Sequence, residues 1–271
     1  MKKLLILFAF ALVAFMAHAQ SCPDDNHPHA IDLGLPSGTK WACCNVGANK
    51  PEEYGAYYAW GETEDKEGYY DLNYIFCTGK DTDGNGYYDQ NIHFQQLDQD
   101  IAGTQYDVAH VKWGGDWQIP SIDQIEELIF HVYRKWDFMN DCVFGMKLCS
   151  NNDTIFFPAT GFRSDTNLYY AGNTISFWLS IMNMSNFRTA SSVYFSNSIN
   201  WYVGYYPRSR GCPVRPVIRI TNNINLPKSP SDISNQSIYN LYGIKVSDST
   251  ANMNTLPPGI YIVSGKKVVI K

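Results

Sequence analysis

The clearest periodic pattern of apolar positions lies between residues 121 and 132. Four apolar residues recur there at helical spacing: Ile125, Leu128, Ile129 and Val132. This spacing places them on one side of a helix, as a face to be buried. Ser121 precedes the pattern and Gln124 follows three positions later, which is the pair that a capping box requires. The pattern therefore predicts a helix that begins after Ser121.

The stretch GGDWQIP, residues 114 to 120, leads into this helix. Gly114 and Gly115 permit positive φ angles and a close backbone approach. Trp117 offers a large surface for burial, and Pro120 fixes the chain just before the cap. Each residue has a local mechanical use, so we interpret this corner as scaffold and not as a reactive site.

Short apolar runs, separated by Gly, Pro, Asn, Ser and Asp, dominate the rest of the chain. Residues 30–62 alternate such runs with turns, whereas residues 63–110 are polar and predict loops. Six strand-like runs follow the helix, at residues 144–150, 154–162, 174–180, 191–196, 199–206 and 212–220. One main helix followed by a meander of short antiparallel strands predicts an α+β fold.

The two ends of the chain have patterns of their own. Lys2 and Lys3, an apolar run and Ala17-His18-Ala19 predict a cleaved signal peptide at residues 1–19. Lipidation at Cys22 is the alternative. The apolar run is too short to cross a bilayer, and no later segment is apolar enough, so we expect no transmembrane segment in the mature chain. The protein is therefore predicted to be secreted or attached to the outer cell surface.

Three further boundaries follow from composition. Residues 20–222 form the main predicted domain, and residues 223–236 form a linker with two prolines and little apolar content. Residues 237–271 predict a small β unit with four short strands around glycine turns, at residues 238–241, 244–246, 260–263 and 268–270.

Charge and cysteine usage exclude several classes of partner and site. The formal net charge is −5 and no basic stripe is present, so no nucleic-acid partner is expected. The seven cysteines contain no C-x-x-C and no Cys/His set at zinc-finger spacing, so the spacing predicts no structural zinc. Pairing of Cys43 or Cys44 with Cys77, and of Cys142 with Cys149, stays open.

Six blocks between residues 29 and 220 resemble one known family. They are AIDLGLPSGTKWACCNVGANKPEEYGAYYAWGET, HVKWGGDWQIPSIDQIEEL, IFFPATGFR, LYYAG, FWLS and VRPV. Together they resemble the Fibrobacter succinogenes major paralogous domain. The resemblance implies a C-type-lectin-like fold, shared with formylglycine-generating enzymes and with variable phage and bacterial binding proteins.

The end of the chain resembles a second known module. YNLYG, LPPGIYIV and GKKVVIK are similar to the C-terminal sorting domain of the Bacteroidetes type IX secretion route. This resemblance implies the secretion machinery as a partner of the tail.

Two segments rich in tyrosine, the second of which also contains arginines, are the predicted ligand-binding surface. The predicted residues are Tyr169, Tyr170, Trp201, Tyr202, Tyr205, Tyr206, Arg208 and Arg210. Tyr, Trp and Arg, with nearby Ser, Gly and Asn, are the residue types of adaptable binding surfaces. The resemblance to lectin-like proteins implies that this late region of the chain carries the binding face. The alternative is that about half of these rings are core, because one face of a strand is buried.

A calcium site is the one cofactor that the sequence raises. In DTDGNG, Asp81, Asp83 and Asn85 occupy the first, third and fifth positions of an EF-hand-type loop. The twelfth position is Ile92, where that loop needs a bidentate Glu. A plain hairpin turn explains the same residues. His27 and His29, in HPH, could hold a metal, but they lie near the predicted mature N-terminus, and the family resemblance favours a structural role for His29.

Catalysis is not expected. Formylglycine-generating enzymes use paired cysteines late in the chain, whereas this region holds only Cys212. No G-x-S-x-G is present, and the Glu-Pro-Asn and Trp-Asn-Asp motifs of calcium-dependent lectins are missing. The sequence therefore predicts a non-catalytic binding or adhesion protein for a glycan or protein ligand. A structural surface or fimbria-like subunit is the alternative, and an enzyme derived from the formylglycine-generating fold is a weaker one.

Overall fold

The computed structural model describes residues 26–85, 87–140, 142–196, 201–218, 237–240, 245–247, 256–257, 259–263 and 266–270. The predicted signal peptide, Cys22 and the predicted linker at residues 223–236 lie outside them. The chain divides into two compact units, Met1–Ile220 and Thr221–Lys271. Each unit is described by itself.

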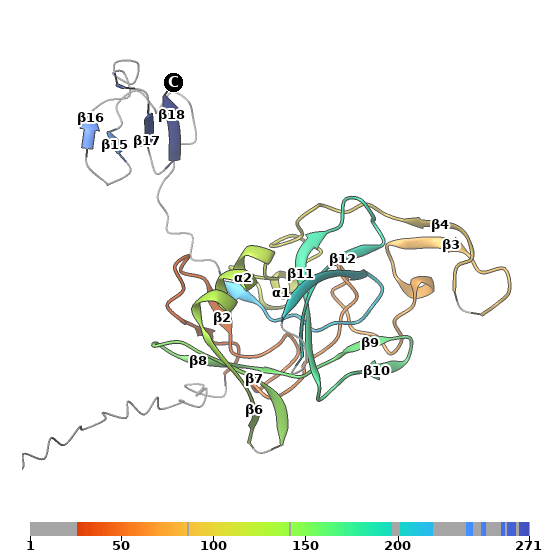
Figure 1. The fold of residues 1–271 in the computed structure, drawn as a ribbon. Helices are drawn as coiled ribbons and strands as arrows, with labels where there is room; N and C mark the ends of the chain where they lie inside the picture. Colours follow the sequence, from red (N-terminus) through yellow and green to blue (C-terminus); the bar gives the residue numbers. More distant parts are fainter. Residues whose placement is uncertain are drawn as a thin grey trace, which may run out of the picture. The chain divides into compact units, whose positions relative to one another are not determined.

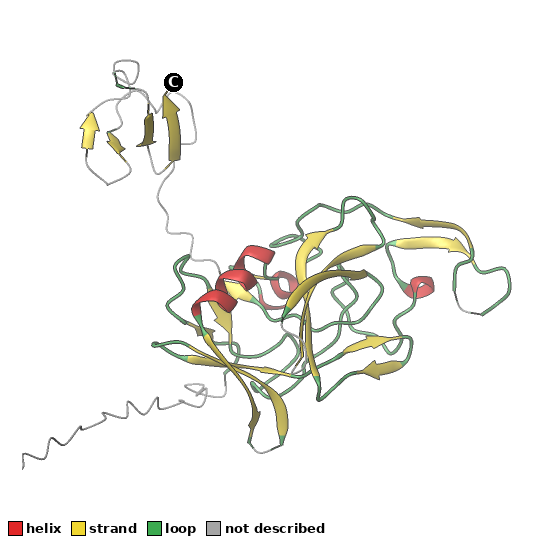
Figure 2. Ribbon diagram, viewed as in Figure 1, coloured by secondary structure: helices red, strands yellow, loops and turns green. Residues whose placement is uncertain are grey.

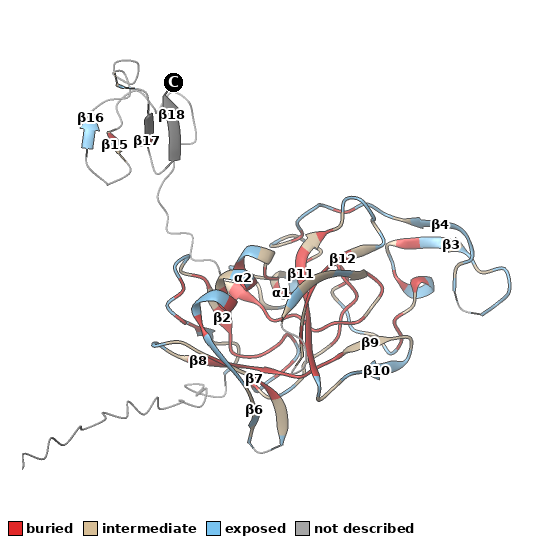
Figure 3. Ribbon diagram, in the orientation of Figure 1, coloured by how far each residue is buried: buried red, intermediate tan, exposed pale blue. Residues whose placement is uncertain are grey.

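The first unit consists mostly of antiparallel β-sheets with few helices, as Figures 1 and 2 show. Its central sheet has the order β11-β12-β13. The three strands are β11 (Thr174–Met182), β12 (Thr189–Ser196) and β13 (Tyr202–Pro207). All residues of β11 except Ile181 are buried, and Figure 3 shows this strand in the buried colour over most of its length.

Burial of β11 is nearly continuous because both faces of its sheet are covered. Phe177 and Val193 pack into a core cluster on one face, together with Trp41. Trp178 and Ala190 pack into a second cluster on the other face. Since side chains alternate along a strand, a two-sided core gives an apolar run in place of an alternating pattern.

Two further sheets and two hairpins complete this unit. One sheet has the order β1-β2-β14-β5 and the other β6-β7-β8, all antiparallel, and the hairpins are β3/β4 and β9/β10. The bounds are β1 (Ala30–Ile31), β2 (Lys40–Ala42), β3 (Cys77–Lys80), β4 (Gln90–Phe94), β5 (Trp117–Gln118), β6 (Tyr133–Met139), β7 (Val143–Cys149), β8 (Thr154–Pro158), β9 (Phe162–Ser164), β10 (Asn167–Tyr169) and β14 (Val217–Ile218).

The predicted central helix is confirmed as α2 (Ile122–His131). Its capping box is complete: the Ser121 hydroxyl accepts a hydrogen bond from the Gln124 amide at 3.2 Å. The Gln124 carboxamide oxygen accepts one from the Ser121 amide at 2.9 Å. Ile125 and Leu128 are fully buried, as the periodicity predicts.

The corner before α2 differs in part from its prediction. Gly114 and Gly115 have φ angles of 69° and 56°, as expected for a left-handed turn. The predicted close approach is wrong, because a Cβ built on either glycine meets nothing within 4 Å. Trp117 is only half-buried, because β5 is the edge strand of its sheet, and Ile119 is the buried residue instead.

The loop prediction for residues 63–110 is confirmed for most of the segment and wrong for four stretches of it. This segment contains the 3-10 helix η1 (Asp71–Asn73), the β3/β4 hairpin and the start of α1 (Val108–Trp113). The helix α1 has only six residues, which is too short for an apolar period to stand out. It is held by its buried N-cap residue Asp107. Strand β6, which the sequence did not predict, is largely exposed (Figure 3).

The second unit is a four-stranded antiparallel sheet, and its four predicted strands are confirmed. They are β15 (Ile238–Asn240), β16 (Lys245–Ser247), β17 (Gly259–Val263) and β18 (Lys266–Ile270), in the order β16-β15-β17-β18. Each strand differs from its predicted bounds by one or two residues.

No disulfide joins the six cysteines that belong to the described part of the chain. Cys142 and Cys149 lie at opposite ends of β7, roughly 20 Å apart at the rise of a strand, so they cannot close a loop. Cys77 belongs to a different core cluster from Cys43 and Cys44. Within the described residues, no helix has the length and apolar character needed to cross a membrane.

Candidate functional site

The two segments predicted to bind ligand meet in one continuous set of rings. We define the aromatic array as Phe162, Tyr169, Tyr170, Tyr194, Tyr202, Tyr206 and Arg210. Four of these residues belong to β12, β13 and the turn that follows β13, and the other three come from β9, β10 and the residue after β10. The array is thus built from two parts of the chain, residues 162–170 and residues 194–210.

Arg210 joins the two halves of the aromatic array. Its guanidinium carbon lies 3.8 Å from the centre of the Phe162 ring and 4.5 Å from that of Tyr206. Both distances are within the range of cation–π attraction. A backbone pairing holds this geometry, since Arg163 and Gly211 exchange hydrogen bonds of 2.7 and 2.9 Å. The hairpin β9/β10 is thereby fixed beside the end of β13.

Ring contacts extend the array on both sides of Arg210. Beyond Phe162, the rings of Tyr169 and Tyr170 lie 5.6 and 5.8 Å away, centre to centre. Beyond Tyr206, its hydroxyl contacts that of Tyr202 at 2.6 Å, and the Tyr202 ring lies 5.1 Å from Tyr194. Burial raises the pKa of Tyr206, as does the Tyr202 hydroxyl, so this phenol stays a neutral hydrogen-bonding group.

Three predicted residues of this surface are exposed enough to contact a ligand within the array: Tyr169 at 38%, Tyr170 at 59% and Tyr202 at 40%. Tyr206 and Arg210 are half-buried beneath them. Tyr170 has a φ angle of 57°, an uncommon conformation for a large side chain. A turn holds this conformation, since the Tyr170 carbonyl accepts hydrogen bonds from the Asn173 and Thr174 amides at 3.1 and 3.0 Å.

Arg208 does not belong to this surface, which corrects the prediction for that residue. It is fully buried, and its Nη1 atom donates to the carbonyls of Gln95 and Phe187 at 2.8 and 2.7 Å. The rings of Trp60 and Tyr74 lie 5.2 Å from its guanidinium. The turn after Pro207 points Arg208 inward, whereas Arg210 stays at the array.

Trp201 and Tyr205 lie on the other face of the sheet from the array. Residues of β13 pair with β12 in unbroken register, so Tyr202 and Tyr206 share one face and Tyr205 takes the opposite one. Trp201 packs against the first core cluster and contacts the Phe130 ring at 6.1 Å. The structure therefore does not bring these two predicted residues together with the other tyrosines.

The predicted calcium loop forms a turn whose acidic groups cluster. Carboxylate oxygens of Asp81, Asp83 and Asp89 lie within 4.8 Å of one another. Asn85 lies beside this cluster: its amide nitrogen donates to Asp83 at 2.9 Å, and its oxygen accepts from the Tyr87 amide at 2.9 Å. Asp89, which the sequence did not indicate, joins the two predicted aspartates.

This acidic loop connects to the hairpin that carries part of the array. The Tyr87 hydroxyl donates to Asp165, which lies in the turn between β9 and β10. That hydrogen bond raises the pKa of Tyr87 to about 12. Tyr87 also contacts the Tyr70 ring at 5.9 Å, so two further exposed or half-exposed rings border the hairpin.

Cys212 is placed in the core, where it meets no solvent. It is fully buried in the second core cluster, with its sulfur 3.8 Å from the Ser176 hydroxyl. Burial raises the pKa of its thiol to about 11, so the thiolate needed for nucleophilic or copper chemistry is disfavoured.

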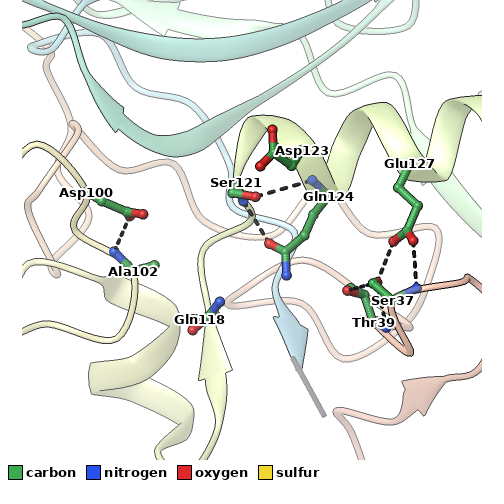
Figure 4. Close-up of a pocket in the computed structure, with 9 residues that line it drawn as sticks. All are labelled: Ser37, Thr39, Asp100, Ala102, Gln118, Ser121, Asp123, Gln124 and Glu127. Atoms are coloured by element: carbon green, nitrogen blue, oxygen red, sulfur yellow. Dashed lines mark hydrogen bonds between the residues drawn. The ribbon is translucent and has the colours of Figure 1, made fainter. Parts of the chain in front are cut away.

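Two hollows lie elsewhere in the first unit. Figure 4 shows the smaller one, of about 260 Å³, at the start of α2. Its polar groups bind one another: Glu127 accepts from the amide and hydroxyl of Ser37 at 2.7 and 2.5 Å, and Asp100 accepts from the Ala102 amide at 3.0 Å. No histidine, cysteine or lysine is among the described residues that line it.

The larger hollow, of about 680 Å³, lies beside the turn that follows Tyr170. Gly172 and Asn173 form one wall, and the rings of Tyr54, Phe138 and Phe144 form another part of its lining. The hollow is therefore an aromatic-lined depression next to one end of the array.

Phe162 and Tyr194 are members of the array that the sequence did not indicate. Phe162 ends the run TIFFPATGF, and Tyr194 lies inside SSVYFS, both of which predicted only strands. A ring inside a strand pattern carries no sign of which face it takes. Comparison with known proteins gives no independent guide to these residues. No protein-family model, no curated protein and no solved structure matches the chain.

Proposed function

We propose that the chain is a secreted or cell-surface, non-catalytic binding protein whose aromatic array contacts a glycan or protein ligand. The observation that carries this proposal is the position of Arg210 between Phe162 and Tyr206. Through it, the two tyrosine-rich segments singled out from the sequence form one surface, held by backbone hydrogen bonds on both sides.

The chemistry of the array suits adaptable recognition. Tyrosine rings offer flat apolar area at low entropic cost, and their hydroxyls supply hydrogen bonds at the rim. Arg210 is held between two rings, so less of its side-chain freedom has to be lost on binding. The hollow beside Gly172 provides a place for a group that projects from the ligand.

The proposal includes the family suggested by the sequence blocks. We infer a C-type-lectin-like domain of the Fibrobacter succinogenes major paralogous type, followed by a tail that interacts with the type IX secretion machinery. The capped helix α2 and the antiparallel sheets support the first part, and the four-stranded second unit supports the other. The burial of Cys212 supports a role without catalysis.

The test is binding of the purified chain to arrays of glycans and matrix proteins. The double variant Tyr170→Ala/Tyr202→Ala is expected to bind the ligand about 30-fold or more weakly, because truncating a central aromatic costs about 2 kcal/mol. Tyr205→Ala is the matched control, since Tyr205 lies in the same strand and is 50% exposed but faces the other side. Equal losses in both variants, or none in the double variant, would contradict the location of the site.

A structural subunit is the second candidate, and one feature favours it. Strand β6 is the open edge of its sheet, and Figure 1 shows the β6/β7 hairpin extending from the rest of the first unit. Tyr133 and Phe138 of β6 expose 69% and 51% of their surface, and Phe130 at the end of α2 exposes 75%. An open edge with exposed rings can pair with a second chain. Self-association in sedimentation experiments, with blank arrays, would favour this candidate.

We also propose calcium as a ligand of the acidic loop, held by Asp81, Asp83 and Asp89. Calcium at about one hundred times its Kd is expected to raise the melting temperature of the wild type by about 5 °C. Asp81→Asn/Asp83→Asn should lose this shift, whereas Asp123→Asn, on the surface of α2, should keep it. A wild type that does not respond to calcium would leave a plain hairpin turn as the function of this loop.

A further inference from the structure

Two imidazoles and two thiols come together at the start of the first unit. The Nδ1 atoms of His27 and His29 lie 3.1 and 3.8 Å from the sulfur of Cys43. The sulfur of Cys44 lies 3.8 Å from that of Cys43. Ligand atoms of His27, Cys43 and Cys44 are all within 4.8 Å of one another. We call these three residues, together with His29 beside Cys43, the His/Cys cluster.

The β1/β2 hairpin places these residues opposite each other. Ala30 pairs with Ala42, and just beyond this pair the Cys43 amide donates to the His29 carbonyl at 3.0 Å. After β2 the chain bends at Cys43 and Cys44. Consecutive residues of a straight strand point to opposite sides, so the bend is what allows both sulfurs to approach the same point.

The cluster lies on a rigid support. Cys43 and Cys44 are fully buried in the first core cluster, next to Trp41, while His27 and His29 are half-buried. The His29 amide donates to the Cys43 sulfur at 3.2 Å. A donor of this kind stabilises a thiolate, which is the form that binds metals.

The distances from the Cys43 sulfur to the three other ligand atoms are close to those of a tetrahedral metal site, and His29 is the one residue outside the group whose ligand atoms all lie within 4.8 Å of one another. With zinc–sulfur bonds of about 2.3 Å and zinc–nitrogen bonds of about 2.0 Å, neighbouring ligand atoms are about 3.5 to 3.8 Å apart. The separations of 3.8 Å between the two sulfurs and 3.8 Å between His29 and Cys43 fall in this range, and His27 at 3.1 Å is slightly closer.

We propose that His27, His29, Cys43 and Cys44 form a structural zinc site. Two thiolates and two imidazoles are a donor set that zinc favours, and harder cations such as calcium and magnesium bind oxygen instead. The metal would tie the segment before β1 to the buried bend after β2. Sequence spacing alone argued against zinc, because this pair of cysteines lacks the interval of a zinc finger and the hairpin supplies the proximity instead.

Cobalt binding by the full-length, reduced, metal-free protein tests the proposal. Co²⁺ bound by thiolates in a tetrahedral site gives intense visible bands and a thiolate-to-cobalt charge-transfer band. One equivalent of Co²⁺ is expected to produce these bands, and one equivalent of Zn²⁺ should abolish them. The stoichiometry of bound zinc after dialysis is then measured by elemental analysis and should be one per chain.

Variants locate the site. Cys43→Ser/Cys44→Ser is expected to lose the charge-transfer band, and His27→Ala should bind zinc about 100-fold more weakly in competition with a chelator, since even outer-shell changes cost 10- to 100-fold. Cys142→Ser and His93→Ala are controls, because both residues are exposed and lie outside the cluster. His27 is only half-buried, so its variant remains informative if the double cysteine variant does not fold.

Three results would overturn the proposal. They are a wild type without thiolate–cobalt bands, bands that persist in Cys43→Ser/Cys44→Ser, and zinc affinity that falls equally in His27→Ala and His93→Ala. Tight binding of Cu(I) that zinc cannot displace, with no retained zinc, would overturn the choice of metal.

Discussion

Replacing Arg215 with methionine is expected to destabilise the first unit by about 4 kcal/mol. Arg215 is fully buried, and each of its three nitrogens donates a hydrogen bond. Nε donates to the Asn45 side chain at 2.7 Å, Nη1 to the Ala42 carbonyl at 3.1 Å and Nη2 to the Phe156 carbonyl at 3.0 Å. Methionine fills much of the volume but leaves three buried acceptors without these donors, and each loss costs about 1–3 kcal/mol.

The position of Arg215 explains why its replacement should destabilise more than one sheet of the first unit. Its partners belong to the end of β2, to the turn after it and to β8, so one guanidinium connects two sheets. The guanidinium carbon of Arg215 also lies 4.7 Å from the centre of the ring of Phe157, which is a core residue. Urea unfolding, followed by tryptophan fluorescence, measures the change.

Arg163→Met is the matched control for Arg215→Met. Arg163 also lies over a ring, that of Tyr57 at 5.2 Å, but it is only half-buried. Its replacement should cost less than about 1 kcal/mol, as is usual for a partly exposed cation. Similar costs for the two variants would show that the buried hydrogen bonds of Arg215 contribute little.

Asp107→Ala is expected to destabilise the first unit by about 3 kcal/mol. The Asp107 carboxylate is fully buried and accepts four backbone amide hydrogen bonds. Oδ1 accepts from Ala109 and His110 at 2.9 and 3.3 Å, and Oδ2 accepts from Gly103 and Ile119 at 2.9 Å each. Alanine removes the N-cap of α1 and leaves four amides without this acceptor.

Part of the loss in Asp107→Ala is offset, because the variant no longer buries a charge. Burial raises the pKa of Asp107, and the four amides oppose this rise. Asp107→Asn separates the two effects. Its oxygen can still accept from two amides, but its amide nitrogen then faces two other N–H groups, so we expect a cost close to that of alanine.

Thermal and urea unfolding of both Asp107 variants checks this prediction. Asp123→Ala is the control, since Asp123 lies in the first turn of α2 without a buried acceptor role, and its loss should cost less than about 1 kcal/mol. A small effect for Asp107→Ala, comparable with that of Asp123→Ala, would contradict the inference that the hydrogen bonds of Asp107 stabilise the start of α1 and the segment after β5.

Local features of the fold follow directly from the sequence. The capping box at Ser121 and the apolar face of α2 depend on residues within four positions of each other, and such contacts are encoded in spacing. The strands of the second unit and the runs at β7, β8, β11, β12 and β13 follow in the same way. Helix α1 was not predicted, because its stability comes from Asp107. The backbone amides that donate to Asp107 range from Gly103 to Ile119.

The composition of the proposed binding surface could be recognised from the sequence, but its membership could not. Tyrosines and arginines in two segments marked the region, whereas register and turn geometry decided which rings face together. Arg208 and Arg210 illustrate this limit. They are the same residue type and only two positions apart, yet Arg208 lies in the core and Arg210 in the array. Burial is set by the elements that pack around a residue and not by its neighbours in the chain.

The sequence by itself determined the main helix and its cap, most of the strands and the two tyrosine-rich segments, because these depend on short-range periodicity and residue type. Only the tertiary structure decided that Arg210 joins the array and that His27 and His29 meet Cys43 and Cys44. Both arrangements depend on strand pairing between residues distant in sequence, and the register of that pairing is set by the packing of the whole unit.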